Sequence, residues 1–418
     1  MLRERMEKLH QKIYPAYAAV RRGMGSFAAH WLSFPVLFLF AFGSVFLISF
    51  LEGYRLFGLN VSIWVYQFYL CDYKVGFCSR LLIGAVITHF TDIVSTDLMN
   101  TIINTAVVLS LFLQSLIVAV ILRIAMKRGS MLGCFITLLF LCNPLAVTEN
   151  MRMPGQIDVY LLVLFLLWSF SYRTPLVYIV SPLICFVCMA IHYEFVLTFL
   201  PPMLILLLYR AVAWPNKRAR FISAFTFVLC AIISAVLLIW FVFFSTSHLR
   251  LTEDEFYYNM LRRFQTDPVT RSANIYKMGT PIYKEFFDTH LFGHIDFSPQ
   301  LFGDHAMSFS YNNPFEYLKL VLTAPTLGSP AEWMKEFILL IPGTFVLTAI
   351  WVICVIREKK GKRFVYICCA AQFMVLFPEI IISTDGWRFI SATFIAQFAV
   401  FFAVYCDKDS DVNQLLRV

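Results

Sequence analysis

Long apolar runs separated by short polar turns constrain this chain more than any other feature. About 20 apolar residues in a helix are needed to cross the hydrocarbon of a bilayer. Ten runs approach that length, at 32–51, 102–126, 129–147, 157–172, 174–191, 195–213, 220–245, 336–356, 363–382 and 388–406. A soluble domain is about a quarter charged, whereas this chain is 60% hydrophobic and 14% charged. A single soluble core cannot hide so many apolar residues, so the sequence predicts an all-α polytopic membrane protein.

The distribution of basic residues predicts the orientation of these helices. If the basic N-terminal segment 1–31 is cytoplasmic, the later clusters Lys217–Arg220 and Arg357–Arg363 also fall on the cytoplasmic side. Lys and Arg are enriched in cytoplasmic connections of membrane proteins. We therefore expect about 10 transmembrane helices, with the N-terminus and the tail 407–418 both in the cytoplasm.

Two outer segments are too long to be simple turns. The first, 52–101, contains apolar stretches at 57–70 and 77–91, which we predict to be interfacial helices, because counting 80–98 as a span would invert every later helix. The second, 246–335, separates the predicted helices 1–7 (32–245) from helices 8–10 (336–406). Its many aromatic residues, interleaved with Pro and Gly, predict a large structured outer loop.

Several classes of function are excluded at this stage. The chain has no Walker-type GxxxxGK[ST] motif and no GxGxxG after a strand, and its cytoplasmic connections are short. The net charge of +8 is spread over cytoplasmic turns, which does not indicate nucleic-acid binding. Most of the 11 cysteines lie in apolar runs, where they behave as small buried hydrophobes, and Cys71 and Cys78 are the one pair expected to face outward.

The most informative polar stretch is Asp72-Tyr-Lys-Val-Gly-Phe-Cys-Ser-Arg80 in the first outer segment. A carboxylate beside Lys74 and Arg80 stays ionised and can accept a proton from a hydroxyl, so Asp72 is the favoured catalytic residue. The planar guanidinium of Arg80 suits a phosphate. The alternative is an Asp72–Arg80 ion pair that fixes the loop. Glu52 is a second catalytic candidate, or it marks the end of the first span.

Further candidates for substrate binding lie in the later outer turns. Arg152 and Asp158 flank the turn before the run 157–172, where Asp158 is equally explained as a favourable charge at a helix start. Asp385 and Arg388 form the last outer turn, where Arg388 either binds a phosphate or reaches lipid headgroups.

His192 and Glu194 form another outer turn. Residues two apart do not share a helical face, but in a tight turn both side chains can reach one cavity. The alternative is a polar anchor at the membrane interface. The histidines of the large loop are predicted to be solvated or packed rather than metal-bound, because no helix places their imidazoles on one face; they are His290, His294 and His305, with Asp296 nearby.

Taken together, the outer turns supply acids and bases, whereas the inner turns supply basic residues only. Cations stabilise a departing phosphate, and a carboxylate activates a hydroxyl nucleophile. The pattern therefore favours a site on the outer face for a lipid phosphate and a hydroxyl acceptor.

This layout resembles the GT-C superfamily of membrane glycosyltransferases, which use polyprenyl-phosphate-linked sugars. The resemblance rests on a cytoplasmic N-terminus, a first outer loop at 52–101 and a second at 246–335 after the seventh span. It also rests on an acid in the first outer loop, at Glu52 or Asp72. The stretch Asp72–Arg80 is similar to one in bacterial cell-envelope membrane proteins grouped with polysaccharide polymerases.

The resemblance implies an enzyme of the bacterial cytoplasmic membrane with its active site facing the exterior. It would transfer a sugar from a polyprenyl-phosphate donor to an envelope glycan or lipid acceptor, with membrane lipids as neighbours and no nucleic acid. Asp72 would be the general base, Arg80 and Arg388 would hold phosphate, and Arg152, His192 and Glu194 would contact sugar or phosphate. No metal ligand is assigned, although a divalent cation is left open.

Two competing functions remain at this stage. A polysaccharide polymerase or ligase would use the outer arginines on a polyprenyl-pyrophosphate oligosaccharide. A lipid or solute transporter would carry charged residues in mid-helix and two repeated halves, for which this sequence offers little beyond Arg123 and Glu379.

Overall fold

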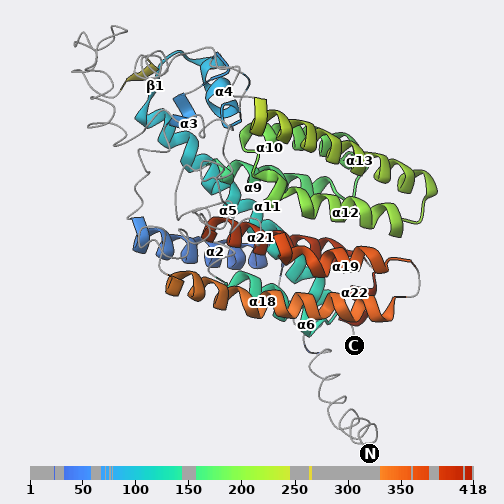
Figure 1. The fold of residues 1–418 in the computed structure, drawn as a ribbon. Helices are drawn as coiled ribbons and strands as arrows, with labels where there is room; N and C mark the ends of the chain where they lie inside the picture. The colour runs from blue at the N-terminus through green and yellow to red at the C-terminus, as the bar shows by residue number, and fades with distance from the viewer. Residues whose placement is uncertain are drawn as a thin grey trace, which may run out of the picture.

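The computed structural model of this chain describes a helical protein (Figure 1). The described residues are 23, 33–57, 67–70, 72–74, 77, 79–143, 157–244, 263–265, 330–358, 361–375, 386–407 and 410–416.

The helices of the first part are α2 Phe34–Phe57, α3 Gln67–Leu70, α4 Leu82–Phe90, α5 Thr96–Lys127 and α6 Met131–Leu141. The following helices are α9 Asp158–Ser171, α10 Val177–Ile191, α11 Phe195–Thr198, α12 Leu200–Ala213 and α13 Lys217–Ile239, which ends in a π-helical turn, Trp240–Phe244. The last are α18 Pro330–Arg357, α19 Arg363–Ala371 with a 3₁₀ turn Gln372–Val375, α21 Gly386–Cys406 and α22 Asp411–Leu415.

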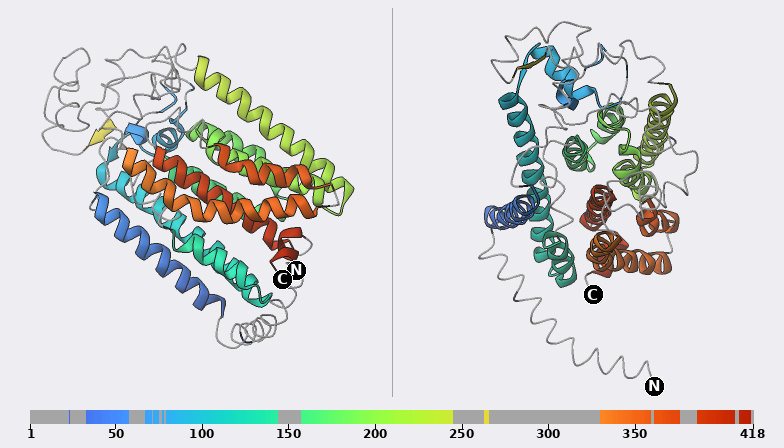
Figure 2. Two further views of the ribbon diagram at one scale, coloured as in Figure 1. Left: turned by 60° about the horizontal axis from the view of Figure 1, so that its bottom comes forward. Right: turned by 60° about the vertical axis from the view of Figure 1, so that its left-hand side comes forward.

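The long helices pack in two groups with their axes roughly aligned (Figure 2). In the first group, α10 and α12 both pack on α13, and α9 packs on α10. In the second, α18 packs on both α19 and α21. Helix α5 lies against α2, α6 and α9, and α12 contacts α21, so the two groups share one apolar core.

Short polar side chains set the beginnings of three helices. Ser95 accepts a hydrogen bond from the backbone N–H of Leu98 at the start of α5, and Ser130 accepts one from Gly133 at the start of α6. Asn216 does the same for Arg218 at the start of α13. Each cap satisfies a backbone donor that the helix leaves without a partner.

Several helices extend beyond the predicted apolar runs. Helix α5 begins at Thr96 rather than at 102, and α18 begins at Pro330 rather than at 336, so both take residues that we had assigned to outer loops. Helix α2 continues to Phe57 and therefore contains Glu52, which does not mark the helix end. The run 195–213 is divided into α11 and α12 at Phe199, just before a Pro-Pro pair.

Helix α4 resolves the ambiguity at 80–98. It has nine residues, which gives a length of about 13.5 Å and is less than half the thickness of the hydrocarbon. Together with α3 it lies at one end of the helical bundle (Figure 1). The described part of 80–98 therefore contains no separate spanning helix.

Two helices among the described residues are long and apolar enough to cross a membrane, within Asp97–Lys127 and Lys217–Ile239. Other apolar helices in the described ranges are shorter by the same criterion. The prediction of buried cysteines holds for Cys185, Cys188 and Cys369 but not for Cys368, which is only partly buried, nor for Cys142, which is exposed.

Two contacts join separate segments at the end of the bundle that carries α3 and α4. Val94–Ser95 (β1) pairs in parallel with Phe264–Gln265 (β2), so the first outer segment meets the large loop 246–335. The indole N–H of Trp240 donates to the carbonyl oxygen of Phe77 at 2.9 Å. Most of the large loop lies outside the described residues, as do Cys71 and Cys78 and the histidines 290, 294 and 305.

Candidate functional site

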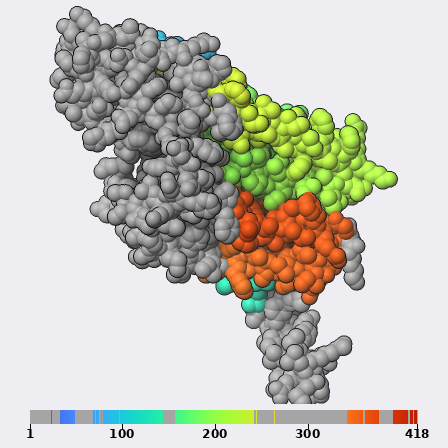
Figure 3. Space-filling view, viewed as in Figure 1, coloured from blue at the N-terminus to red at the C-terminus, as the bar shows by residue number. Residues whose placement is uncertain are grey.

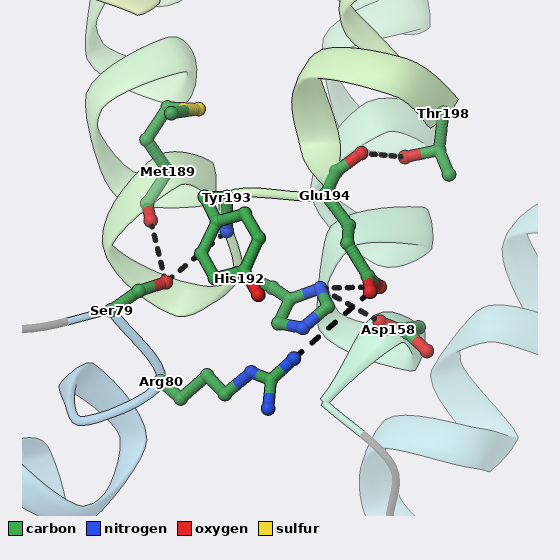
Figure 4. Close-up of polar contacts among 8 residues, drawn as sticks. All are labelled: Ser79, Arg80, Asp158, Met189, His192, Tyr193, Glu194 and Thr198. Atoms are coloured by element: carbon green, nitrogen blue, oxygen red, sulfur yellow. Dashed lines mark hydrogen bonds and ion pairs between the residues drawn. The ribbon is translucent and has the colours of Figure 1, made fainter. Parts of the chain in front are cut away.

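A turn between α10 and α11 forms the centre of the candidate site. Helix α10 ends at Ile191, His192 has an extended backbone, and Glu194 stands at the start of α11. This short turn directs both side chains to one side of the backbone (Figure 4). The side chains of His192 and Glu194 therefore contact each other across the tight turn.

The site brings together four ionisable residues from three separate segments (Figure 4). The Nδ1 atom of His192 lies 2.9 Å from Oε2 of Glu194 and 3.5 Å from Oδ1 of Asp158. The Nη2 atom of Arg80 lies 4.0 Å from Oε1 of Glu194. We call these residues, Arg80, Asp158, His192 and Glu194, the outer cluster, a name taken from the predicted outer segment 52–101 that carries Arg80.

Backbone contacts fix the loop that carries Arg80. The hydroxyl of Ser79 donates to the Met189 carbonyl oxygen at 3.3 Å and accepts the N–H of Tyr193 at 3.1 Å. The N–H of Arg80 donates to the Ala190 carbonyl oxygen at 3.1 Å. Arg80 has a φ angle of 70°, a left-handed conformation that is strained for a residue with a side chain. The loop is therefore held against the end of α10.

The side chain of Arg80 is held between aromatic rings. Its guanidinium carbon lies 6.0 Å from the ring centre of Phe68 and 5.6 Å from that of Tyr193. Such contacts attract a cation to the ring face. The Nε atom of Arg80 is buried and makes no hydrogen bond among the described residues. The two ring contacts hold the guanidinium beside Glu194. The Nε–H group remains a donor that a ligand can accept from.

His192 is only 2% exposed. Burial lowers the pKa of its imidazole, while the neighbouring carboxylates of Glu194 and Asp158 oppose that shift and Arg80 adds to it. The ring is therefore neutral at neutral pH, and one of its nitrogens carries a lone pair.

Asp72 lies in a second polar contact of the same region, and its partners differ from those expected. Its Oδ2 atom lies 3.7 Å from Nη1 of Arg263 and 4.0 Å from Nζ of Lys74, and its Oδ1 atom accepts the Lys74 N–H at 2.8 Å. Arg263 also donates to the Leu70 carbonyl oxygen. The described residues include no ion pair between Asp72 and Arg80, so the predicted alternative, a local pair, is wrong.

Sequence reasoning missed Arg263 and Ser79. Arg263 lies in the large loop, far along the chain from Asp72, and no local spacing links the two. Ser79 was visible only as a small polar residue beside Arg80, although it makes two of the contacts that hold the loop.

The structure does not describe the side chains of the other four candidates. Arg152 and Asp385 are outside the described residues. Glu52 and Arg388 belong to α2 and α21, but their side chains are not among those described. Of the ten predicted site residues, the structure therefore joins Arg80, Asp158, His192 and Glu194 in one cluster and Asp72 and Lys74 in another contact.

Three members of the outer cluster have the side-chain types that hold metal ions. Asp158, His192 and Glu194 each offer one ligand atom, and these atoms lie within 4.8 Å of one another. Chemically, the cluster combines two carboxylates, a neutral imidazole and a fixed guanidinium in a largely buried setting.

Comparison with protein-family models, with curated proteins and with solved structures finds no match to this chain.

Proposed function

We propose that this chain is a polytopic membrane protein of about ten spans whose outer cluster lies at the exterior face. Helix α13 supports the membrane assignment, because one of its faces presents apolar side chains that are each more than half exposed: Phe221, Phe225, Val228, Ile232, Val236 and Ile239. This helix lies at the outside of the molecule (Figure 3). A contiguous apolar face of this kind is costly in water and favourable in lipid.

We propose further that the protein transfers a sugar from a polyprenyl-phosphate donor to a hydroxyl acceptor, as its resemblance to GT-C glycosyltransferases implies. One observation carries this proposal: four ionisable side chains from three distant segments contact one another at the loop-bearing end of an apolar bundle. Ionisable groups bordering a membrane are costly and so mark functional sites.

Arg80 and Asp72 each have a role in this reaction that their surroundings favour. The guanidinium of Arg80, held by two aromatic rings and by the strained loop, binds the donor phosphate and stabilises it as the bond to the sugar breaks. Asp72, placed between Arg263 and Lys74, accepts the proton of the acceptor hydroxyl as that oxygen attacks the sugar carbon. The phosphate leaves with the bonding electron pair, so the step is balanced without a cofactor.

The test is a transfer assay with the full chain in lipid nanodiscs. Radiolabelled polyprenyl-phosphate hexoses are supplied with a crude envelope glycan acceptor, and label moving from lipid to glycan is counted. We expect Asp72→Asn to lower transfer by about 10²- to 10⁴-fold, the usual contribution of a general base. Donor binding, measured separately, should change little.

The matched control is Asp97→Asn, because Asp97 is an exposed acid in the first turn of α5. It should transfer at the wild-type rate. Wild-type activity in Asp72→Asn would remove Asp72 from the mechanism. Absence of transfer from every polyprenyl-phosphate hexose by the wild type, with activity on polyprenyl-pyrophosphate oligosaccharides instead, would replace the proposed reaction by polymerisation or ligation.

A further inference from the structure

We propose that Asp158, His192 and Glu194 form a binding site for one divalent transition-metal cation, such as Mn²⁺ or Zn²⁺. The start of α9 supplies Asp158, and the turn between α10 and α11 supplies the other two residues (Figure 4). This inference is independent of the transfer reaction, since it concerns the side chains alone.

The distances suit three ligands of one ion. Nitrogen and oxygen ligands lie about 2.1 Å from such a cation, so two ligands at right or tetrahedral angles are about 3.0 to 3.4 Å apart. The Nδ1 atom of His192 lies 2.9 Å from Glu194 Oε2 and 3.5 Å from Asp158 Oδ1. All three ligand atoms lie within 4.8 Å of one another.

A second observation points to a ligand at this place. Among the described residues, the buried Nδ1 atom of His192 makes no hydrogen bond of good geometry, although an oxygen of the Glu194 carboxylate lies 2.9 Å away. This separation is short enough for a hydrogen bond, but the ring N–H direction gives an unfavourable N–H···O angle. A buried polar atom without a partner costs free energy. A cation bound by this nitrogen and by the neighbouring carboxylate would give the imidazole a partner.

The surroundings hold the three ligands in position. The turn is tied to the first outer loop through Ser79, which contacts the backbone of both Met189 and Tyr193. Asp158 lies in the first turn of a regular helix. The ligand set combines one imidazole with two carboxylates, and mixed nitrogen and oxygen donors favour Mn²⁺ or Zn²⁺ over Ca²⁺.

The experiment is a Mn²⁺ titration of the purified full chain in detergent after removal of metals with a chelator. Free Mn²⁺ is followed by its electron paramagnetic resonance signal, and Zn²⁺ is then added as a competitor. We expect one Mn²⁺ bound per chain, displaced by Zn²⁺, and a higher thermal midpoint in its presence. No tight binding of either ion to the wild type would overturn the proposal.

Variants assign the site. His192→Gln, Asp158→Asn and Glu194→Gln should each weaken Mn²⁺ binding at least tenfold and remove the thermal shift. The matched controls His89→Gln and Asp97→Asn alter residues outside the cluster and should bind like the wild type. Wild-type affinity in all three cluster variants would place the ion elsewhere and overturn the assignment. Because Mn²⁺ binding and sugar transfer are measured separately, either proposal can fail without the other.

Discussion

At the residue scale, His192 controls how the outer cluster responds to pH. It is buried between Asp158 and Glu194, with Arg80 nearby, and burial lowers its pKa in the folded chain. The unfolded chain binds the proton with the ordinary pKa of about 6.5. At a pH between the folded-state and unfolded-state pKa values of His192, the unfolded state therefore holds more protons than the folded state. The stability that neutral His192 contributes is fully present above the unfolded-state pKa and is lost as the pH falls through this range.

We accordingly expect the thermal midpoint of the metal-free chain to fall as the pH is lowered below about 6.5. His192→Gln should make this fall shallower, because the substituted side chain does not titrate. Thermal unfolding in detergent at a series of pH values measures the slope. His89→Gln is the control, since His89 lies outside the cluster in the last turn of α4. Equal slopes for the wild type and His192→Gln would contradict the expectation.

Single residues also show what local sequence patterns can predict. Arg80, Asp158, His192 and Glu194 were identifiable because each is an ionisable residue beside an apolar run. The partner of Asp72 was not, because Arg263 reaches it from a distant loop and only the folded chain brings the two together. The alternative considered for Asp72, a local pair with Arg80, fails because Arg80 is directed to Glu194.

At the element scale, the close contact between α6 and α21 depends on Gly133. A methyl group there would stand 2.6 Å from the Tyr405 hydroxyl and 2.8 Å from the Ser130 hydroxyl. Ser130 cannot move freely, because its hydroxyl donates to the Leu416 carbonyl oxygen and caps α6. Gly43 in α2, by contrast, has nothing within 4 Å of the same position.

Gly133→Ala should therefore destabilise the fold by about 1 to 3 kcal/mol through overpacking. Gly43→Ala should be neutral or stabilise by up to about 1 kcal/mol, because Ala is the better helix former. Thermal unfolding of the two variants side by side makes the comparison. Similar shifts of the midpoint in both would show that α6 does not pack as closely as described.

Helix existence was easier to predict than helix ends. The apolar runs located the long helices, but α5 begins at Thr96, just after the cap Ser95, and α18 begins at Pro330, both before their runs. A polar first turn is stabilised by capping or by proline at the first position rather than by burial. The hydrophobicity of the sequence therefore does not locate the polar first turns of helices such as α5 and α18.

At the scale of the whole molecule, the proposed topology places the outer cluster and the start of α13 on opposite sides of the membrane. Single cysteines introduced at Asp92 and Arg218, both exposed positions, test this arrangement. A membrane-impermeant maleimide applied to intact cells should label Asp92→Cys above the wild-type background. It should label Arg218→Cys only after permeabilisation. Labelling of both from outside would contradict the topology.

That the described residues would be mostly helical followed from the long apolar runs, whose length fits helices rather than strands. Which helices pack against each other could not be predicted in the same way. That α12 contacts α21, or that the tail forms α22 against α18, depends on side-chain shapes far apart in the sequence. The meeting of the two outer loops through β1 and β2 was likewise invisible before the fold was known.

The central claim is that the outer cluster receives a lipid phosphate. The most direct measurement is a cryo-electron microscopy map of the chain in nanodiscs with a polyprenyl-phosphate hexose. We expect the phosphate within about 3 Å of the Arg80 guanidinium, the distance of a charge-assisted hydrogen bond. A phosphate bound at the opposite end of the bundle, with no lipid at Arg80, would contradict the claim.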